Sequence, residues 1–189
     1  MQILKWAGMQ IERLNNKCKI AALVLMAFLI TSLQSPSREY RIKATFLFNF
    51  TQFVEWPANT FENDNDPLVI GVMGGNPFGS FLDQLVQGEK INGRPLIVQH
   101  YTNARDIKSC HILFVNDINA EGLKEIMISM KGRHVLTASD ASNFISQGGI
   151  IRFINEDNKV RFQINLDAAK KNDILISPKL LRLAEIVSH

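Results

Sequence analysis

The side chains best suited to chemistry are few, and their spacing does not assemble a metal site. Histidine and cysteine are the usual ligands of transition metals, and zinc sites often show pairs such as C-x-x-C or H-x-x-x-H. The histidines lack any such spacing: His100, His111, His134 and His189. Both His111 and His134 fall near the starts of predicted strands, where structural histidines are the commoner outcome. We therefore expect no bound metal.

Cys110 and His111 are adjacent in the segment CHILFV, and a thiol beside an imidazole is one arrangement of an activated nucleophile. The same segment begins a short apolar strand, in which a free cysteine usually behaves as a small buried hydrophobe. We favour the buried thiol. A redox-active or intermolecular role for Cys110 is the alternative.

No catalytic motif is present: the sequence contains neither a G-x-S-x-G nucleophile elbow nor a kinase signature. Gly74 and Gly75 follow an apolar strand, but neither phosphate-binding glycine pattern is present, which favours a plain tight turn over an anion site. Acids such as Asp117, Asp140 and Asp167 could meet in space, although their spacing does not favour a carboxylate pair. We expect a protein that is not an enzyme and that needs no cofactor.

One helical segment offers the first candidates for binding a partner. The run from Ser37 to Trp56 places apolar residues on one broad face, with Ser37 as N-cap and Pro57 as the residue that stops the helix. Lys43 interrupts this face, and an ion pair or a snorkelling side chain is the ordinary explanation. Phe48 falls among polar residues, where a single exposed apolar residue is common. Together with Trp56, however, Phe48 could form an apolar patch for a partner, and we take Phe48, Trp56 and Lys43 as candidates.

The first 35 residues have the composition of an export signal. Two lysines precede an uninterrupted apolar stretch from Ile20 to Ile30, and small polar residues follow it. A transmembrane helix needs about 20 apolar residues, so a signal peptide over residues 1–35 is favoured over an uncleaved membrane anchor. Cleavage would remove Cys18 and leave Cys110 as the single cysteine, without an internal disulfide.

The remainder of the chain is electrically neutral. Four basic residues and one acid lie before residue 36, which leaves 17 residues of each sign from there on. The longest basic run in this part is Lys170-Lys171. A nucleic-acid-binding domain needs a basic patch that neutralises phosphates, so we exclude nucleic acid as a partner.

Strand and helix patterns alternate along residues 37–189. Strands are expected at 68–73, 96–101, 112–115, 134–138, 150–154, 159–164 and 174–176, and helices at 37–56, 77–86, 118–130, 140–145, 167–171 and from residue 178 onward. Asn76 and Asp140 are the expected N-caps of the second and fourth helices. The turn Glu156-Asp157-Asn158 predicts a β-hairpin in the C-terminal half.

This alternation predicts one α/β domain over residues 37–189. Strands that alternate with helices favour a largely parallel sheet, and the hairpin adds an antiparallel part. We predict a three-layer α/β sandwich with a mixed sheet and an N-terminal amphipathic helix.

The run EYRIKATFLFNFTQFVEWP, from Glu39 to Pro57, resembles the opening signature of the YfiR-like family of periplasmic proteins. Similar segments follow in the same order: PLVIGVMGGNPFG (67–79), NGRPLIV (92–98), CHILFV (110–115), VLTASD (135–140), GGIIRF (148–153), VRFQINLDAA (160–169) and ISPKLLRLA (176–184). Several collinear motifs are more specific than one short pattern, and they cover nearly the whole chain after the export signal.

The resemblance implies a periplasmic regulator, often a dimer, that restrains a membrane-bound diguanylate cyclase by binding its periplasmic sensor region. Release of that inhibition would raise cyclic di-GMP in the cell and favour biofilm formation. Such a protein performs no chemistry, because it acts through different affinities for two states of its partner. Members of the family also serve other membrane receptors.

Two departures from the family pattern concern candidate residues. Gln163 stands where the family usually has an acid, in VRFEINL, and it becomes a further candidate for partner contact. The protein for which the family is named carries cysteine pairs with a redox-sensitive role, whereas this chain keeps only Cys110 after cleavage. Redox control through an internal disulfide is therefore not expected.

Two other classes of function are alternatives to the regulator. A periplasmic protein that binds or senses a small solute is suggested by the glycine-rich turn in an α/β body, although two-lobed receptors need a longer chain. A hydrolase would need scattered acids to converge on a pocket as a carboxylate pair.

Overall fold

The computed structural model describes residues 36–188. The predicted signal peptide, residues 1–35 with Cys18, lies outside the described residues. Between residues 36 and 188, no helix has both the length and the apolar composition that crossing a membrane requires.

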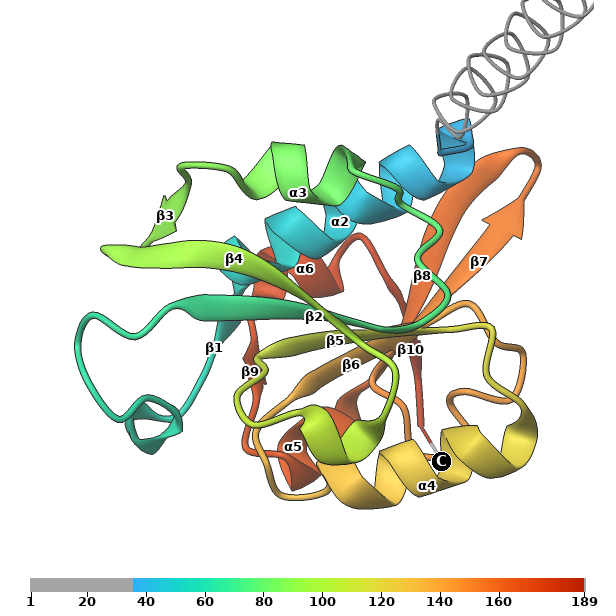
Figure 1. Ribbon diagram of the computed structural model, residues 1–189. Coiled ribbons are helices and arrows are strands. Elements are labelled where there is room, and N and C mark those ends of the chain that lie inside the picture. The colour runs from blue at the N-terminus through green and yellow to red at the C-terminus, as the bar shows by residue number, and fades with distance from the viewer. Residues whose placement is uncertain (1–35, 189) are drawn as a thin grey trace, which may run out of the picture. The chain divides into compact units, whose positions relative to one another are not determined.

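An eight-stranded sheet organises the chain (Figure 1), in the order β10-β8-β7-β6-β5-β2-β4-β3. Its strands are β2 (Leu68–Gly74), β3 (Lys90–Ile91), β4 (Arg94–Tyr101), β5 (Ile112–Asn116), β6 (Leu136–Ser139), β7 (Ile151–Glu156), β8 (Lys159–Asn165) and β10 (Glu185–Val187). Only the β7/β8 and β3/β4 pairs are antiparallel. The prediction of a mixed, largely parallel sheet is confirmed. A separate ribbon pairs β1 (Val54–Glu55) with β9 (Leu175–Ile176).

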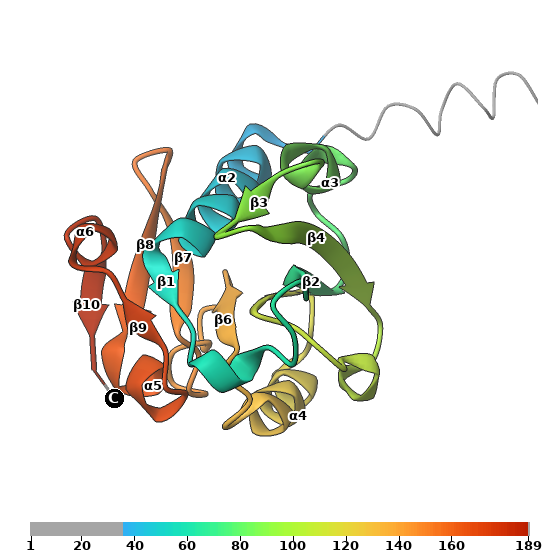
Figure 2. The ribbon, with the colours of Figure 1, turned by 90° about the vertical axis from the view of Figure 1, so that its left-hand side faces the viewer.

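Helices cover both faces of the sheet, as Figures 1 and 2 show. They are α2 (Arg38–Phe53), α3 (Phe81–Val86), α4 (Ala120–Met130), α5 (Leu166–Lys171) and α6 (Pro178–Leu181), with short 3₁₀ turns η1 (Ala58–Thr60) and η2 (Ala104–Asp106). Helices α2, α3 and α6 pack against one apolar core, here called the first face. Helix α4 and η2 pack against a second core on the other face. The predicted three-layer α/β sandwich is confirmed.

Aromatic rings join α2 to the β7/β8 hairpin. The ring of Phe50 lies 5.4 Å from that of Phe162 and 6.0 Å from that of Phe153, between ring centroids. Phe46 lies 5.2 Å from Phe162 on the same side. Because a fully buried side chain of this size contributes about 1.5–3 kcal/mol, these contacts are a main source of α2 stability.

Helix α2 ends earlier than its sequence pattern predicts. Ser37 is the N-cap as expected, and its hydroxyl accepts a hydrogen bond from the Tyr40 amide. The helix stops at Phe53 instead of Trp56, because Val54 is extended and pairs with Ile176 in the β1/β9 ribbon. Pro57 restricts only the residue before it, so a partner far along the chain sets this boundary.

The turn after β2 is longer than predicted. Asn76 does not cap a helix: its Oδ1 accepts from the Phe78 amide at 3.0 Å, and its Nδ2 donates to the Gly79 carbonyl at 2.9 Å. These bonds close a tight turn, and α3 begins only at Phe81, about one helical turn later. Gly74, at φ +86°, sits where a Cβ would clash with the Asn116 carbonyl, which explains the glycine.

The expected helix over residues 140–145 is absent, and residues 142–148 form a series of turns. Asp140, expected as its N-cap, directs its carboxylate toward α2 instead. There it meets Lys43 and Tyr40, which provide a charged and a hydroxyl donor in place of backbone amides. The Asp157-Asn158 turn does form the predicted hairpin, with both residues at positive φ.

Candidate functional site

Lys43 lies in the first-face core and is paired. Its side chain is 3% exposed, and Nζ lies 2.6 Å from Glu39 Oε1 and 2.7 Å from Asp140 Oδ2. Tyr40 donates to the same Asp140 oxygen at 3.0 Å. Burial, followed by the charge of Asp140, raises the pKa of Tyr40 to about 12. The paired ammonium therefore connects α2 to the end of β6. This is the ion pair that the sequence analysis gave as the ordinary explanation for Lys43.

Trp56 is partly buried beside a buried histidine. Its Nε1 donates to the carbonyl of His111 at 3.3 Å, and its ring meets the imidazole edge to face. Phe61 stacks on the same imidazole, with 4.5 Å between ring centroids. Two aromatic residues, Trp56 and Phe61, therefore attach the segment after β1 to His111, just before β5.

The environment of His111 defines its tautomer and keeps it neutral. The Val69 amide donates to Nδ1 at 3.0 Å, so the proton of the neutral ring is on Nε2. Burial, and then the charge of Arg94, lowers the pKa of His111 to about 4. This histidine is a structural acceptor at neutral pH, in agreement with the commoner expectation for it.

Phe48 does not stand alone among polar side chains. It is partly buried and packs against the first-face core, as Trp56 also does. Each of the two aromatic residues predicted as one patch is therefore held by core contacts of its own.

Cys110 is buried on the second face. Its Sγ–H donates to the Ile112 carbonyl at 3.1 Å, and burial raises the pKa of the thiol to about 12. Thiolate is the reactive form of cysteine, so this environment favours the small buried hydrophobe over a nucleophile.

Gln163 lies in a polar row that crosses three strands. Arg152 on β7, Gln163 on β8 and Glu185 on β10 stand directly opposite one another in the strand pairing. Arg152 donates to Gln163 Oε1 at 3.4 Å, and Gln163 Nε2 donates to Glu185 Oε2 at 3.1 Å. The neighbours Phe153 and Phe162 point into the first-face core, so the row lies on the second face. The amide thus connects a cation to an anion across the sheet.

Two exposed apolar side chains lie in β10 or just before it. The side chains of Leu183 and Ile186 are 69% and 45% exposed. Strand β10 is also an edge of the sheet, where backbone groups on the outer side are open to another chain. We call Gln163, Leu183, Glu185 and Ile186 the β10 surface.

The sequence pointed to only one residue of the β10 surface. Gln163 was found because it departs from the family pattern. Leu183 and Ile186 were missed because the helix predicted from residue 178 onward was expected to include them, whereas α6 ends at Leu181 and β10 begins at Glu185. A short apolar strand with no polar alternation was the signal available there.

Comparisons with known proteins complete the description of the site. A family model described as YfiR/HmsC-like matches residues 40–185. No curated protein matches the chain. Among solved structures, a conserved domain protein from Vibrio cholerae O1 biovar eltor is similar at 15% sequence identity and a TM-score of 0.40. The alignment covers 64% of this chain and 54% of that one, so the chain spans about half of the length of the solved protein.

Proposed function

Because the chain belongs to the YfiR/HmsC-like family, we propose that it is a non-catalytic periplasmic regulator that restrains a membrane-bound diguanylate cyclase. It binds the periplasmic sensor region of that partner and so lowers cyclic di-GMP signalling and biofilm formation. The family match, which runs from α2 into β10, is the observation that carries the proposal.

The N-terminal segment supports the location. An apolar stretch of signal-peptide length between Ile20 and Ile30 would direct the chain out of the cytoplasm. Removal of residues 1–35 would then release the domain that begins at residue 37.

We propose the β10 surface as the contact with the partner. Leu183 and Ile186 supply exposed apolar area at this edge, and Glu185 and Gln163 supply polar groups on the face of the sheet opposite to Ile186. Protein–protein interfaces typically combine apolar area with polar groups at the rim. In this proposal Phe48, Trp56 and Lys43 act indirectly, because they fix α2 and the following loop against the sheet.

Regulation requires that the chain bind one state of the partner more tightly than the other. A chain that prefers the inactive cyclase shifts the population toward that state by its difference in affinity and by nothing else. A homodimer formed through the same edge strand would compete with the partner for the β10 surface.

The test compares three variants in a strain that lacks the chromosomal copy. Leu183→Glu and Ile186→Glu place a charge on the β10 surface, whereas Leu175→Glu changes an equally exposed leucine on β9. Cellular cyclic di-GMP and recovery of a membrane protein with the tagged chain are measured together. Wild type and Leu175→Glu should lower cyclic di-GMP and retain the partner, and the two β10 variants should do neither.

Each other outcome has its own meaning. If all three variants behave like wild type, the contact lies elsewhere and the regulator role stands. If wild type neither lowers cyclic di-GMP nor retains a membrane protein, the proposed function is wrong. If the β10 variants change only the oligomeric state, the edge serves a second copy of this chain.

A further inference from the structure

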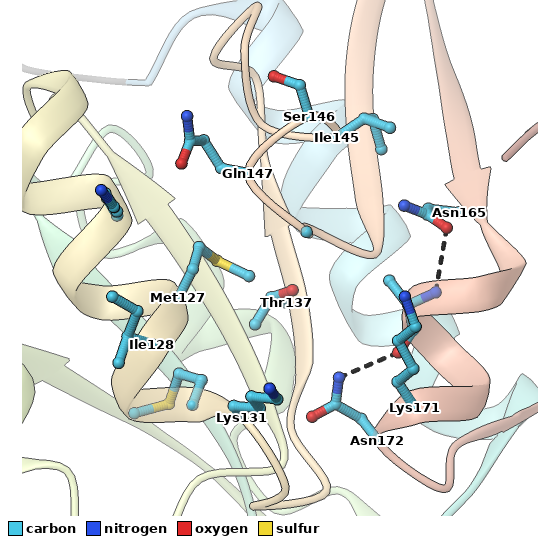
Figure 3. A pocket seen from close by; sticks show the side chains of 14 residues that line it. Met127, Ile128, Lys131, Thr137, Ile145, Ser146, Gln147, Asn165, Lys171 and Asn172 are labelled. Carbon is cyan, nitrogen blue, oxygen red and sulfur yellow. Dashed lines mark hydrogen bonds between the residues drawn. The ribbon is translucent and has the colours of Figure 1, made fainter. Parts of the chain in front are cut away.

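A pocket of about 480 Å³ lies between α4 and α5 (Figure 3). Figure 3 shows side chains of α4 on one side, those of α5 on the other, and Thr137 of β6 between them. The turn over residues 145–148 borders the same space. A volume of this size lies within the range of small-molecule sites in proteins.

The lining combines an apolar part with an excess of positive charge. Met127, Met130 and Ile145 supply apolar surface. The charged residues of the lining are Lys124, Lys131 and Lys171, and the lining contains no aspartate or glutamate. Within residues 36–188, no carboxylate lies within 4.0 Å of these three ammonium groups. This local excess stands out in a chain that is neutral after residue 36.

Hydrogen bonds hold the walls of the pocket in place. Asn172 Oδ1 accepts from the Gly132 amide at 3.1 Å, and its Nδ2 donates to the Ala168 carbonyl at 3.0 Å, which connects the ends of α4 and α5. Asn165 caps α5 by accepting from the Ala168 amide at 3.0 Å. Thr137 Oγ1 accepts from the Ile150 amide at 3.2 Å beneath them. A pocket formed in advance reduces the ordering cost of binding a ligand.

We propose that this pocket binds a small organic anion, in which a carboxylate or phosphate group meets the lysines and an apolar group contacts the methionines. Charge-assisted hydrogen bonds from ammonium groups are stronger than neutral ones. Methionine side chains adapt to irregular apolar shapes, which suits the apolar part of such a ligand. The proposal is separate from the regulator role, because no residue of α2 lines the pocket and its lining shares no residue with the β10 surface, although Asn165 lies two residues from Gln163 on β8.

The test uses the chain purified from the envelope after export, labelled with ¹⁵N and titrated with three probes. Phenyl phosphate carries both chemical parts, inorganic phosphate only the anion and phenol only the ring. We expect saturable shifts of the Lys131, Gly148 and Asn172 amides with phenyl phosphate. Inorganic phosphate and phenol should each bind about tenfold more weakly, because one type of contact is missing.

Paired variants then identify the charges that matter. The double variant Lys131→Gln, Lys171→Gln should weaken phenyl phosphate binding by about tenfold or more, the loss of a charge-assisted contact. Lys159→Gln, on the hairpin and outside the pocket, should bind like wild type. The three lysines changed in these variants, Lys131, Lys171 and Lys159, are exposed, so the amide signals of the rest of the protein should not shift.

Three results would overturn the proposal. One is the lack of saturable shifts in the pocket below about 20 mM phenyl phosphate, a concentration that corresponds to very weak affinity. Another is equal binding of phenol and phenyl phosphate, which would remove the role of charge. The last is unchanged affinity in the double variant.

Discussion

Gln163 lies directly opposite Glu185 in the parallel pairing of β8 with β10, and its amide donates to the carboxylate at 3.1 Å. An amide can accept from Arg152 and donate to Glu185 at once, which a carboxylate cannot do. Where the family pattern has an acid at this position, the last strand of this chain is therefore attached by a different arrangement.

Replacement of Gln163 by Glu should loosen β10. Two carboxylates directly opposite each other destabilise a strand pair by about 0.2–1 kcal/mol, so amide hydrogen exchange over residues 185–187 should accelerate by a factor between about 1.4 and 5 at neutral pH. Protonation near pH 4 should remove the difference. Gln163→Met, which loses both hydrogen bonds without adding charge, should show no such pH dependence. Equal exchange in the Glu variant and wild type would contradict the role of the amide.

Removal of the Asp140 carboxylate should cost more than removal of the Lys43 ammonium. Asp140→Ala leaves a buried ammonium with Glu39 alone and takes the acceptor from Tyr40, so the free energy of unfolding should fall by about 2–3 kcal/mol. Lys43→Met leaves partly exposed carboxylates that water can reach, and about 1 kcal/mol is expected. Urea denaturation of both variants measures the order. Glu125→Ala, which changes an exposed acid on α4, is the control, and a reversed order would show that water reaches Lys43.

Folding stability should depend on pH through His111. The pKa of His111 is about 4 in the folded protein and 6.5 in the unfolded chain. Between these pH values the unfolded chain therefore binds more protons than the folded protein. The contribution of the buried neutral ring is present above pH 6.5 and is lost as pH falls toward 4. The full effect is at most about 3 kcal/mol, since each pKa unit corresponds to about 1.4 kcal/mol.

The measurement is the free energy of unfolding at pH 7 and pH 5 for wild type and His111→Asn. The asparagine keeps an acceptor for the Val69 amide but does not titrate, so the fall in stability between these pH values should be smaller than in wild type. His100→Gln, which changes an exposed histidine, should keep the wild-type dependence. If His111→Asn and wild type lose stability equally, other groups cause the effect.

The Cys110 thiol should not react in the folded protein. A pKa near 12 leaves almost no thiolate at neutral pH, and the side chain is 6% exposed. Ellman's reagent should label Cys110 only after urea unfolding, with the position assigned by peptide mass spectrometry. Rapid labelling without denaturant would restore the redox-active alternative.

Elements set by local pattern were predictable from the sequence, whereas boundaries set by distant partners were not. The Ser37 cap, the Asp157-Asn158 hairpin and the largely parallel character of the sheet follow from nearby residues and from the alternation of strands with helices. The end of α2 depends on Ile176, more than a hundred residues away in the chain, and no periodicity reveals that pairing. The same applies to Asp140, whose partners lie on α2.

The candidate sites show the same limit. Lys131 and Lys171 are ordinary surface lysines in the sequence, and only the placement of α4 beside α5 brings them to one pocket. Lys43, in contrast, was recognisable because a charge within an apolar helical face requires a partner. A single residue that breaks a local pattern can be recognised from the sequence, whereas a cluster formed by residues of distant elements cannot.

The aromatic contact between α2 and the hairpin also affects the order in which the chain folds. Phe46 and Phe50 cannot bury their rings until Phe153 and Phe162 have been synthesised, because those residues form the other half of the contact. Contacts of such sequence separation slow folding and prolong the time for which apolar surface is open. The helix that begins the domain therefore keeps an exposed apolar face until the hairpin has been synthesised, so the first-face core is completed only when most of the chain is available.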